Sequence, residues 1–293
     1  MQINVYTRNY SVEIEHKEAL FMLSSRKREI RIQADFFREK CKISRYGIID
    51  LFKECDRMGY KLLRYPLGEE ADLGFALKKD DDTIICINTS IRLSREIFTL
   101  AHEIGHAILH LNVEQPFIDN NATIGGSNAD DKEQEANYFA ICLLMPSDEV
   151  ERFIDLELPD FEKNGLSGMD IARIMSEFNV SYEVVLNRLE SLGKIDSNQK
   201  TQLETERTEK RVGNLLKSIG GNSRLNIASN EIVIPYEYID YVIYNYNHNA
   251  IPKETLEKVL ECYQLGIEDI SDRLAIFPEE EDNLDDLIGG LED

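Results

Sequence analysis

Residues 98–110 read Phe-Thr-Leu-Ala-His-Glu-Ile-Gly-His-Ala-Ile-Leu-His and contain the pattern His-Glu-x-x-His at residues 102–106. Side chains four residues apart lie on one face of a helix, so the imidazoles of His102 and His106 can reach the same metal ion. Glu103 follows the first imidazole and is placed to take a proton from a metal-bound water rather than to bind the metal. This stretch therefore predicts a zinc hydrolase, and within that class a peptidase.

The metal site needs a third protein ligand, because a catalytic zinc ion usually has three and keeps one position for water. His110 lies one turn beyond His106, but three imidazoles on successive turns span too much of one helix to close a tetrahedral site. The extended pattern with a third His is excluded, because Leu109 and Asn112 stand where it needs Gly and His. The third ligand must therefore come from another part of the chain.

A carboxylate from residues 133–137, Glu-Gln-Glu-Ala-Asn, is the better candidate. Asn137 lies four residues after Glu133 on the same helical face, where its amide can hydrogen-bond the far nitrogen of a ligating His. Glu135 points to a different side and lacks such a partner. A purely structural zinc site is disfavoured, because such sites usually contain thiolates and would leave Glu103 without a task. The metal ligands that the sequence favours are His102, His106 and Glu133.

Composition limits the class of protein. The 293 residues are 42% hydrophobic and 30% charged, as in soluble globular proteins, and the length allows two domains or one domain with additions. No run approaches the roughly 18 apolar residues of a membrane span, and residues 1–10 do not resemble a secretory signal. The five Cys stand singly, which indicates reduced thiols in a cytoplasmic protein.

The charge of the chain points to the kind of partner it can bind. A net charge of −22 argues against binding nucleic acid through the general surface, because phosphate contacts need Lys and Arg. It favours attraction to a basic partner. Part of the charge lies in residues 279–293, which hold eight acids and no base and are expected to form a solvated tail. The sequence sets no oligomeric state.

Apolar spacing and turn residues predict both strands and helices. Strands are expected at residues 60–65, 74–77 and 83–88, and a short one at 2–6. The motif helix is expected at residues 94–111 with Ser94 as its N-cap, followed by a loop at 113–131. The other expected helices lie at residues 26–42, 48–57, 132–144, 167–178, 181–192 and 198–218, and a last, mainly helical segment interrupted by Pro252 lies at 233–277.

Two runs of this sequence resemble the ImmA/IrrE family of bacterial metallo-endopeptidases. The first run is Arg95-x-x-Phe98-Thr99-x-Ala101-His102-Glu103-x-Gly105-His106. The second run is Glu133-x-Glu135-Ala136-Asn137-x-Phe139-Ala140-x-x-Leu143-Leu144-Met145-Pro146. The resemblance extends over roughly residues 45–150, and it is the pairing of the two motifs that makes it specific.

The resemblance implies a zinc-dependent, gluzincin-like endopeptidase. In such proteins zinc is held by the two His and a Glu of the second motif, which carries over to His102, His106 and Glu133, with Glu103 as general base. Members typically cleave a helix-turn-helix repressor encoded nearby, in mobile elements, phage regulation, or stress and defence responses. The alternative is a catalytically silent zinc-binding regulator that sequesters a repressor or a toxin.

The expected fold is α+β. A zincin-like core of a small mixed sheet, the motif helix and a second ligand helix occupies residues 1–160, and a mainly α-helical region follows. Residues 161–197 resemble a helix-turn-helix, but acids outweigh the few Arg there, so we expect these helices to pack on the core rather than to bind DNA. Residues 198–293 form a helical C-terminal region with the acidic tail.

One strand is a candidate for binding substrate. An extended peptide can add to a sheet edge through main-chain hydrogen bonds. The strand before the motif helix is the candidate for this role, and the alternative is an ordinary sheet strand. Its residues are Ile84, Ile85, Cys86, Ile87 and Asn88.

Overall fold

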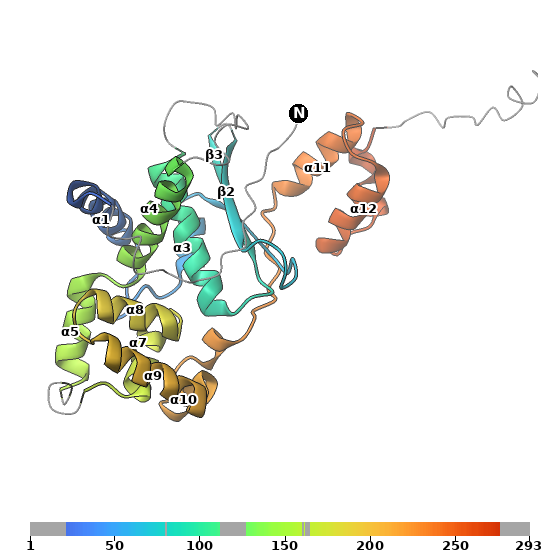
Figure 1. The fold of residues 1–293 in the computed structure, drawn as a ribbon. Helices are drawn as coiled ribbons and strands as arrows, with labels where there is room; N and C mark the ends of the chain where they lie inside the picture. The colour runs from blue at the N-terminus through green and yellow to red at the C-terminus, as the bar shows by residue number, and fades with distance from the viewer. Residues whose placement is uncertain (1–21, 80, 112–126, 160, 162–164, 276–293) are drawn as a thin grey trace, which may run out of the picture. The chain divides into compact units, whose positions relative to one another are not determined.

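The computed structural model describes residues 22–79, 81–111, 127–159, 161 and 165–275 (Figure 1). The expected strand at residues 2–6, most of the loop at 113–131 and the acidic tail at 279–293 lie outside these residues. The chain forms two compact units, Met1–Ile234 and Pro235–Asp293. In the described part of the chain, no helix is long and apolar enough to cross a bilayer.

The first unit combines a small mixed sheet with helices, and a helical region follows, which confirms the predicted α+β class and a zincin-like core. Its elements are α1 (Ser24–Arg38), α2 (Leu51–Arg57), β1 (Lys61–Tyr65), β2 (Gly74–Lys79), β3 (Asp82–Asn88), α3 (Leu93–Leu109), α4 (Ser127–Leu144), α5 (Ser147–Glu157), α7 (Gly168–Phe178), α8 (Tyr182–Ser191), α9 (Ser197–Lys210), α10 (Val212–Ser218) and η2 (Ser223–Asn226). The second unit contains α11 (Tyr238–Asn247), α12 (Lys253–Cys262) and η3 (Ile267–Arg273) around a small apolar core of its own.

The sheet has the strand order β1–β3–β2, with β3 parallel to β1 and antiparallel to β2. Cys86 of β3 pairs with Leu63 on one side and with Phe75 on the other. Because both sides of β3 are occupied, the structure contradicts the expectation that residues 84–88 bind a substrate strand. The uninterrupted apolar run of this strand is typical of a central strand buried on both faces, and not of an edge strand.

The motif helix α3 is not capped by Ser94, which is buried inside its first turn. The N-cap is Arg92, and the amide of Leu93 donates to the carbonyl of Ile227 at 2.8 Å. Arg92 and Ala228 also form an isolated β-bridge. A backbone segment from far along the chain therefore satisfies the start of the helix, in place of the expected local side chain.

The two ligand-bearing helices approach closely at a glycine. As Figure 1 shows, α3 lies between the sheet and α4. Helix α4 begins at Ser127, before the expected residue 132. A Cβ atom on Gly105 would lie 3.2 Å from the Cα and carbonyl oxygen of Ala136 and 3.1 Å from the ring of Phe139. The absence of a side chain at Gly105 therefore lets the two helix backbones come together.

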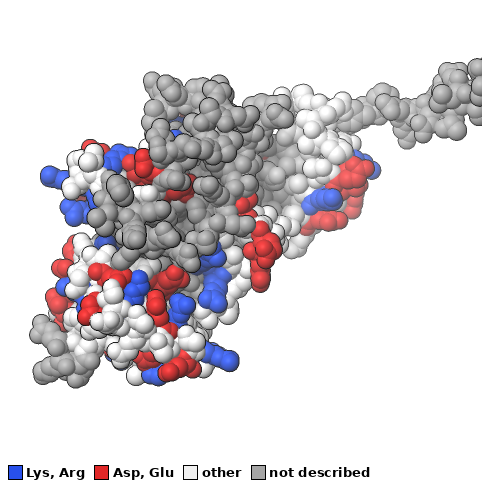
Figure 2. All heavy atoms as spheres, in the orientation of Figure 1, with Lys and Arg blue, Asp and Glu red and all other residues white. Residues whose placement is uncertain are grey.

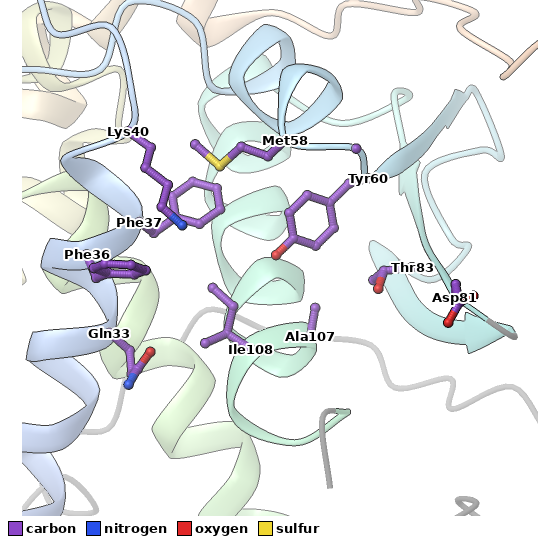
Figure 3. Close-up of a pocket in the computed structure, with 11 residues that line it drawn as sticks. Gln33, Phe36, Phe37, Lys40, Met58, Tyr60, Asp81, Thr83, Ala107 and Ile108 are labelled. Carbon is purple, nitrogen blue, oxygen red and sulfur yellow. The ribbon is translucent and has the colours of Figure 1, made fainter. Parts of the chain in front are cut away.

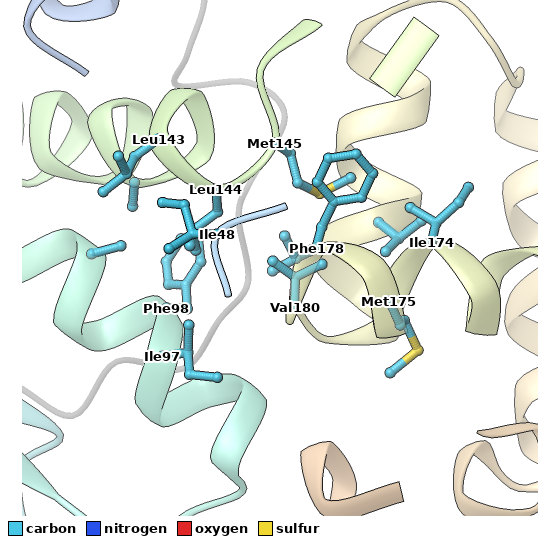
Figure 4. Packing of buried hydrophobic residues seen from close by; sticks show 14 of the residues in the cluster. Ile48, Ile97, Phe98, Leu143, Leu144, Met145, Ile174, Met175, Phe178 and Val180 are labelled. Carbon is cyan, nitrogen blue, oxygen red and sulfur yellow. The ribbon is translucent and has the colours of Figure 1, made fainter. Parts of the chain in front are cut away.

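The helices that resemble a helix-turn-helix pack on the core. Ile174 and Phe178 of α7 belong to the same buried cluster as Ile48 and Leu144, and Figure 4 shows this packing. The carboxylate of Glu177 also accepts hydrogen bonds from the hydroxyl of Ser44 at 2.7 Å and from the amide of Tyr46 at 3.0 Å. This end of α7 is therefore joined to the loop that precedes α2.

The second helix of that pair is buried on most sides. Tyr182 and residues 184–189 of α8 are all buried. A recognition helix must present an exposed face to the major groove of DNA. On the face of the molecule in Figure 2, the described acidic and basic side chains are interspersed rather than gathered into one broad basic patch. Both observations favour a structural role for α7 and α8.

The boundary between the two units differs from the predicted one. Boundaries were expected after residues 160 and 197, whereas the chain divides after Ile234. Helices α9 and α10 pack on α7, and the hydroxyl of Tyr182 donates to the carbonyl of Leu203 at 3.0 Å. Residues 198–234 therefore belong with the first unit.

A buried ionic network holds the end of this unit against α3 and the sheet. Arg64 of β1 donates to Glu96 of α3 at 2.6 Å and to Glu231 at 2.5 Å. The hydroxyl of Ser229 donates to the other oxygen of Glu96 at 2.7 Å. Arg64 and Glu96 are 5% and 0% exposed, so loss of either partner would leave a buried charge uncompensated. Residues 229–231 are therefore tied to the start of the motif helix.

We expect one cysteine to react faster than the other four. None of the five Cys, all of which lie in the described residues, forms a disulfide; four are buried, and Cys262 is partly exposed. Burial raises the pKa of Cys86 to about 12 and that of Cys41 to about 11, so these thiols hold their protons at pH values near 8. A coloured disulfide reagent should show a single fast phase that Cys262→Ser removes, with all thiols reacting in denaturant. Several fast phases in the folded protein would contradict this burial.

Gly105→Val should destabilise the first unit, because the added carbons must displace α4. Overpacking of this kind costs about 1–3 kcal/mol. The matched control is Gly213→Val in α10, where a Cβ atom would meet nothing closer than 3.5 Å. The measurement is the free energy of unfolding by denaturant, followed by circular dichroism. Equal stability of the two variants would show that α3 and α4 do not require this close approach.

Candidate metal centre

Three side chains from two helices converge on one point. His102 and His106 lie one turn apart on α3, and their Nε2 atoms are 3.0 Å apart. The two carboxylate oxygens of Glu133 in α4 each contact one of these nitrogens: Oε2 lies 3.3 Å from His102 and Oε1 lies 3.3 Å from His106. Among the described residues, this is the one group of His, Cys, Asp and Glu whose ligand atoms all lie within 4.8 Å of one another. Two imidazole nitrogens and a carboxylate oxygen form a donor set that fits a divalent metal.

The charge of Glu133 suits a metal ligand. Burial alone would raise its pKa, but the hydrogen bonds with His102 and His106 outweigh burial and hold the pKa well below its usual range. The carboxylate is therefore ionised at neutral pH, as metal binding requires.

Glu103 lies beside this group but faces the sheet. It is 4% exposed, and its carboxylate accepts a hydrogen bond from the backbone of Ala76 in β2. Burial raises the pKa of Glu103 to about 7, against the opposing effect of His102. A carboxyl group with a pKa near the working pH both accepts and releases protons efficiently. Glu103 therefore lies outside the converging group and has the pKa expected of a group that carries protons.

The strand beside Glu103 is an edge strand. The amide of Asn88 donates to the carbonyl of Leu73, and hydrogen bonding alternates along an antiparallel pair. The backbone groups of Gly74, Ala76 and Lys78 therefore face away from β3. Among the described residues, no other strand pairs with this side of β2. The available sheet edge is on β2, next to the proton carrier.

The far nitrogen of His102 is held by an amide. Its Nδ1 atom lies 3.0 Å from Oδ1 of Asn137, one turn after Glu133 on α4. An amide oxygen only accepts hydrogen bonds, so Nδ1 carries the proton and Nε2 keeps its lone pair for a metal. Asn137 therefore sets the tautomer and orientation of this imidazole.

His106 is held by a longer chain of groups. Its Nδ1 atom lies 3.0 Å from Nδ1 of His110, whose Nε2 atom lies 3.1 Å from Glu135. Glu135 in turn accepts two hydrogen bonds from Arg26 of α1, at 2.7 and 2.5 Å. A carboxylate accepts only, so Nε2 of His110 carries the proton and its Nδ1 accepts from His106. This chain leaves Nε2 of His106 free to bind a metal.

Sequence reasoning missed this chain. Both His110 and Glu135 were weighed as possible ligands, but His110 contacts the candidate ligand His106 and Glu135 lies behind His110. Burial lowers the pKa of His110 to about 4, which keeps this imidazole neutral at pH 7. The four-residue spacing from His106 to His110 was a usable signal. The contact of Arg26 with Glu135 spans 109 positions in the chain and has no local signal.

A cavity of the first unit lies outside this centre. It has a volume of about 560 Å³ and is bounded by α1, the turn between α2 and β1, the start of β3 and the C-terminal half of α3 (Figure 3). Phe37, Tyr60 and Ile108 line it, and Nζ of Lys40 lies 4.1 Å above the ring of Phe36. None of the converging ligands nor Glu103 lines this cavity, so it is separate from the candidate chemistry.

His110→Ala should weaken metal binding without removing a ligand. Loss of a group that orients a ligating His typically costs about 10–100-fold in metal affinity. Zinc affinity can be measured by competition with a coloured chelator, and Glu135→Gln should cause a smaller loss in the same direction. The matched control is His248→Ala, an exposed His of the second unit. An unchanged affinity in both His110→Ala and Glu135→Gln would contradict the orienting role.

Comparison with known proteins finds a family match over part of the chain. Residues 55–190 match the model of the M78 peptidase family, described as an IrrE N-terminal-like domain. "Uncharacterized immunity region protein 2" of Bacillus phage phi105 is 32% identical over 85 residues, which are 29% of this chain and 52% of that protein. This chain therefore matches about half the length of that curated relative.

A similar solved structure is a Mycobacterium tuberculosis transcriptional regulator, with a TM-score of 0.36 and 17% identity over 57% of this chain and 47% of that one. The family match spans the elements from the end of α2 to α8, including both ligand-bearing helices. It confirms the family that the paired motifs indicated and supports a metallopeptidase type of function. Over residues 55–190, this chain matches the IrrE N-terminal-like domain of the M78 peptidase family.

Proposed function

We propose that this chain is a zinc-dependent endopeptidase with Glu as the third ligand, as in gluzincins. The observation that carries the proposal is the convergence of His102, His106 and Glu133, with the buried Glu103 beside them. The donor set is the one that hydrolytic zinc takes with two His and one Glu. The M78 domain supports the peptidase class.

Each residue has a defined task in peptide hydrolysis. Bound zinc would polarise the scissile carbonyl and lower the pKa of water. Glu103 accepts the proton of the attacking water, whose oxygen bonds to the carbonyl carbon. Glu103 then delivers that proton to the nitrogen of the leaving amine as the peptide bond breaks. Asn137 and the chain from His110 to Arg26 hold the two imidazoles in place throughout.

The edge of β2 is the proposed place for the substrate backbone. An extended segment that adds to this edge would hydrogen-bond the outward groups of Gly74 and Lys78 and the carbonyl of Ala76, whose amide donates to Glu103. Ala76 contacts Glu103, so a peptide bond at this position lies beside the proton carrier. An edge strand accepts a segment from the middle of a chain, which suits an endopeptidase.

The proposed substrate is a specific regulatory protein of the helix-turn-helix repressor type, encoded nearby. The resemblance to ImmA/IrrE proteins supports this substrate class, and the similar phage protein is named for an immunity region. The net charge of −22 is complementary to a basic DNA-binding protein and would speed their encounter. Such a reaction would take place in the cytoplasm. The rival proposal is a silent zinc-binding regulator that sequesters the same partner.

Glu103→Gln should separate hydrolysis from binding. The substitution keeps the shape of the side chain and removes its ability to carry a proton, so cleavage should fall by about 10²–10⁴-fold. Zinc content, measured by elemental mass spectrometry, should stay at the wild-type value. Cleavage is measured by mass spectrometry on the helix-turn-helix protein encoded beside this gene, after incubation with each variant.

Two further variants complete this experiment. Glu133→Ala should lose both zinc and cleavage, and Glu151→Gln, an exposed acid of α5, should behave as wild type. If Glu103→Gln still relieves repression in a reporter strain, the protein acts by sequestration and the endopeptidase proposal fails.

A further inference from the structure

A second cavity lies where the C-terminal end of α4 meets α1, α5 and α8. Its volume is about 360 Å³, which falls in the range of roughly 300–1,000 Å³ that small-molecule sites occupy. All of its lining belongs to the first unit, and none of it belongs to the metal centre. The side chains that matter here are Arg31, Asp35, Cys142, Ser147, Asp148 and Arg188.

Four charges surround this cavity without forming ion pairs. Arg31 and Arg188 make no ion pair with any acid in the described part of the chain, nor do Asp35 and Asp148 with any base. Many other charges of the first unit do form ion pairs, such as Arg173 with Asp170. Two bases and two acids are therefore held apart around one space.

The deepest of these charges is Arg188. It is 8% exposed, and its one hydrogen bond within the described structure runs from Nε to the carbonyl of Met145 at 2.9 Å. Burial lowers the pKa of this guanidinium, the sign of a charge removed from water. A buried charge is costly unless a counter-charge compensates it. The two terminal nitrogens of Arg188 are therefore open to an anionic group in the cavity.

The other charges form a rim of mixed sign. Arg31 and Asp35 lie one turn apart on the exposed side of α1, and Asp148 lies in the first turn of α5. Burial, together with the nearby carboxylate of Asp148, raises the pKa of Asp35. The start of α5 has no side-chain cap, so its first amides add positive potential beside Ser147. The base of the cavity is therefore positively charged through Arg188, and its rim includes the two acids Asp35 and Asp148.

We propose that this cavity binds a small zwitterion of the α-amino acid type. The carboxylate lies against Arg188 and Arg31, and the ammonium group lies toward Asp35 and Asp148. A simple anion would meet the two acids, and a simple cation would meet the two arginines, so neither satisfies all four charges. This site is independent of the proposed peptidase activity and of the metal.

Isothermal titration calorimetry of the full chain tests the proposal. The probes are glycine, alanine and leucine, with acetate, methylammonium and inorganic phosphate as partial ligands. At least one of the amino acids should bind, and about tenfold or more tighter than acetate or methylammonium. Absence of binding by all three amino acids up to about 10 mM would overturn the proposal. Equal or tighter binding of acetate or phosphate would also overturn it, because it would indicate a simple anion site.

Variants locate the binding site. Arg31→Gln and Asp148→Asn change exposed rim residues and should each weaken amino acid binding by about tenfold. Arg188→Gln should abolish it, but Arg188 also binds the end of α4, so this result counts only if the unfolding curve is unchanged. The matched control is Arg173→Gln, an exposed Arg of α7 away from the cavity. Wild-type binding in both rim variants would overturn the proposal.

Discussion

The close contact between α3 and α4 is the constraint on which the metal centre depends. Two candidate ligands come from α3 and one from α4, so a carboxylate can complete the proposed site only if the two helix backbones come near each other. The bare face of Gly105 against Ala136 allows this approach. The same contact explains why a small residue stands between Glu103 and His106 in the motif. The geometry of the candidate site therefore depends on how closely α3 and α4 pack.

Near this contact, one imidazole is held by a side chain of α4 alone, and the other is held by a series of side chains that extends to α1. His102 is oriented by Asn137, an amide on the same helix as the third ligand. His106 is oriented through His110 and a carboxylate that is itself held by Arg26 of α1. The first arrangement is set within the α3–α4 pair alone, whereas the second brings in a third helix. The geometry of the centre is therefore shared by three helices.

Patterns in the sequence correctly predicted those features of the site that depend only on residues close together in one helix. An α-helix has about 3.6 residues per turn, so residues four apart, such as His102 and His106 or Glu133 and Asn137, share a face that the sequence already shows. The order of strands depends on hydrogen bonds between distant segments. For this reason residues 84–88 were assigned to the wrong position in the sheet. The apolar run of that strand did carry the correct signal, burial on both faces.

The start of α3 was mispredicted for the same kind of reason. Ser94 has the chemistry of an N-cap, but the carbonyl of Ile227 occupies that role from a remote part of the chain. The charges around Arg188 also come from helices that are distant in sequence. No local pattern marks such contacts, because each residue type involved is common on protein surfaces.

The ionic network at Glu96 and the hydrogen bonds of Arg26 affect whether this domain can be transferred into another protein. Residues 55–190 contain every proposed ligand and the proton carrier, yet Arg26, Ser229 and Glu231 lie outside them. In this chain the domain is therefore contacted by side chains that lie outside it. Its flanking segments complete the support of the motif helix, so a gene fusion that transplanted only the shared domain would carry the reactive groups without the scaffold that orients them.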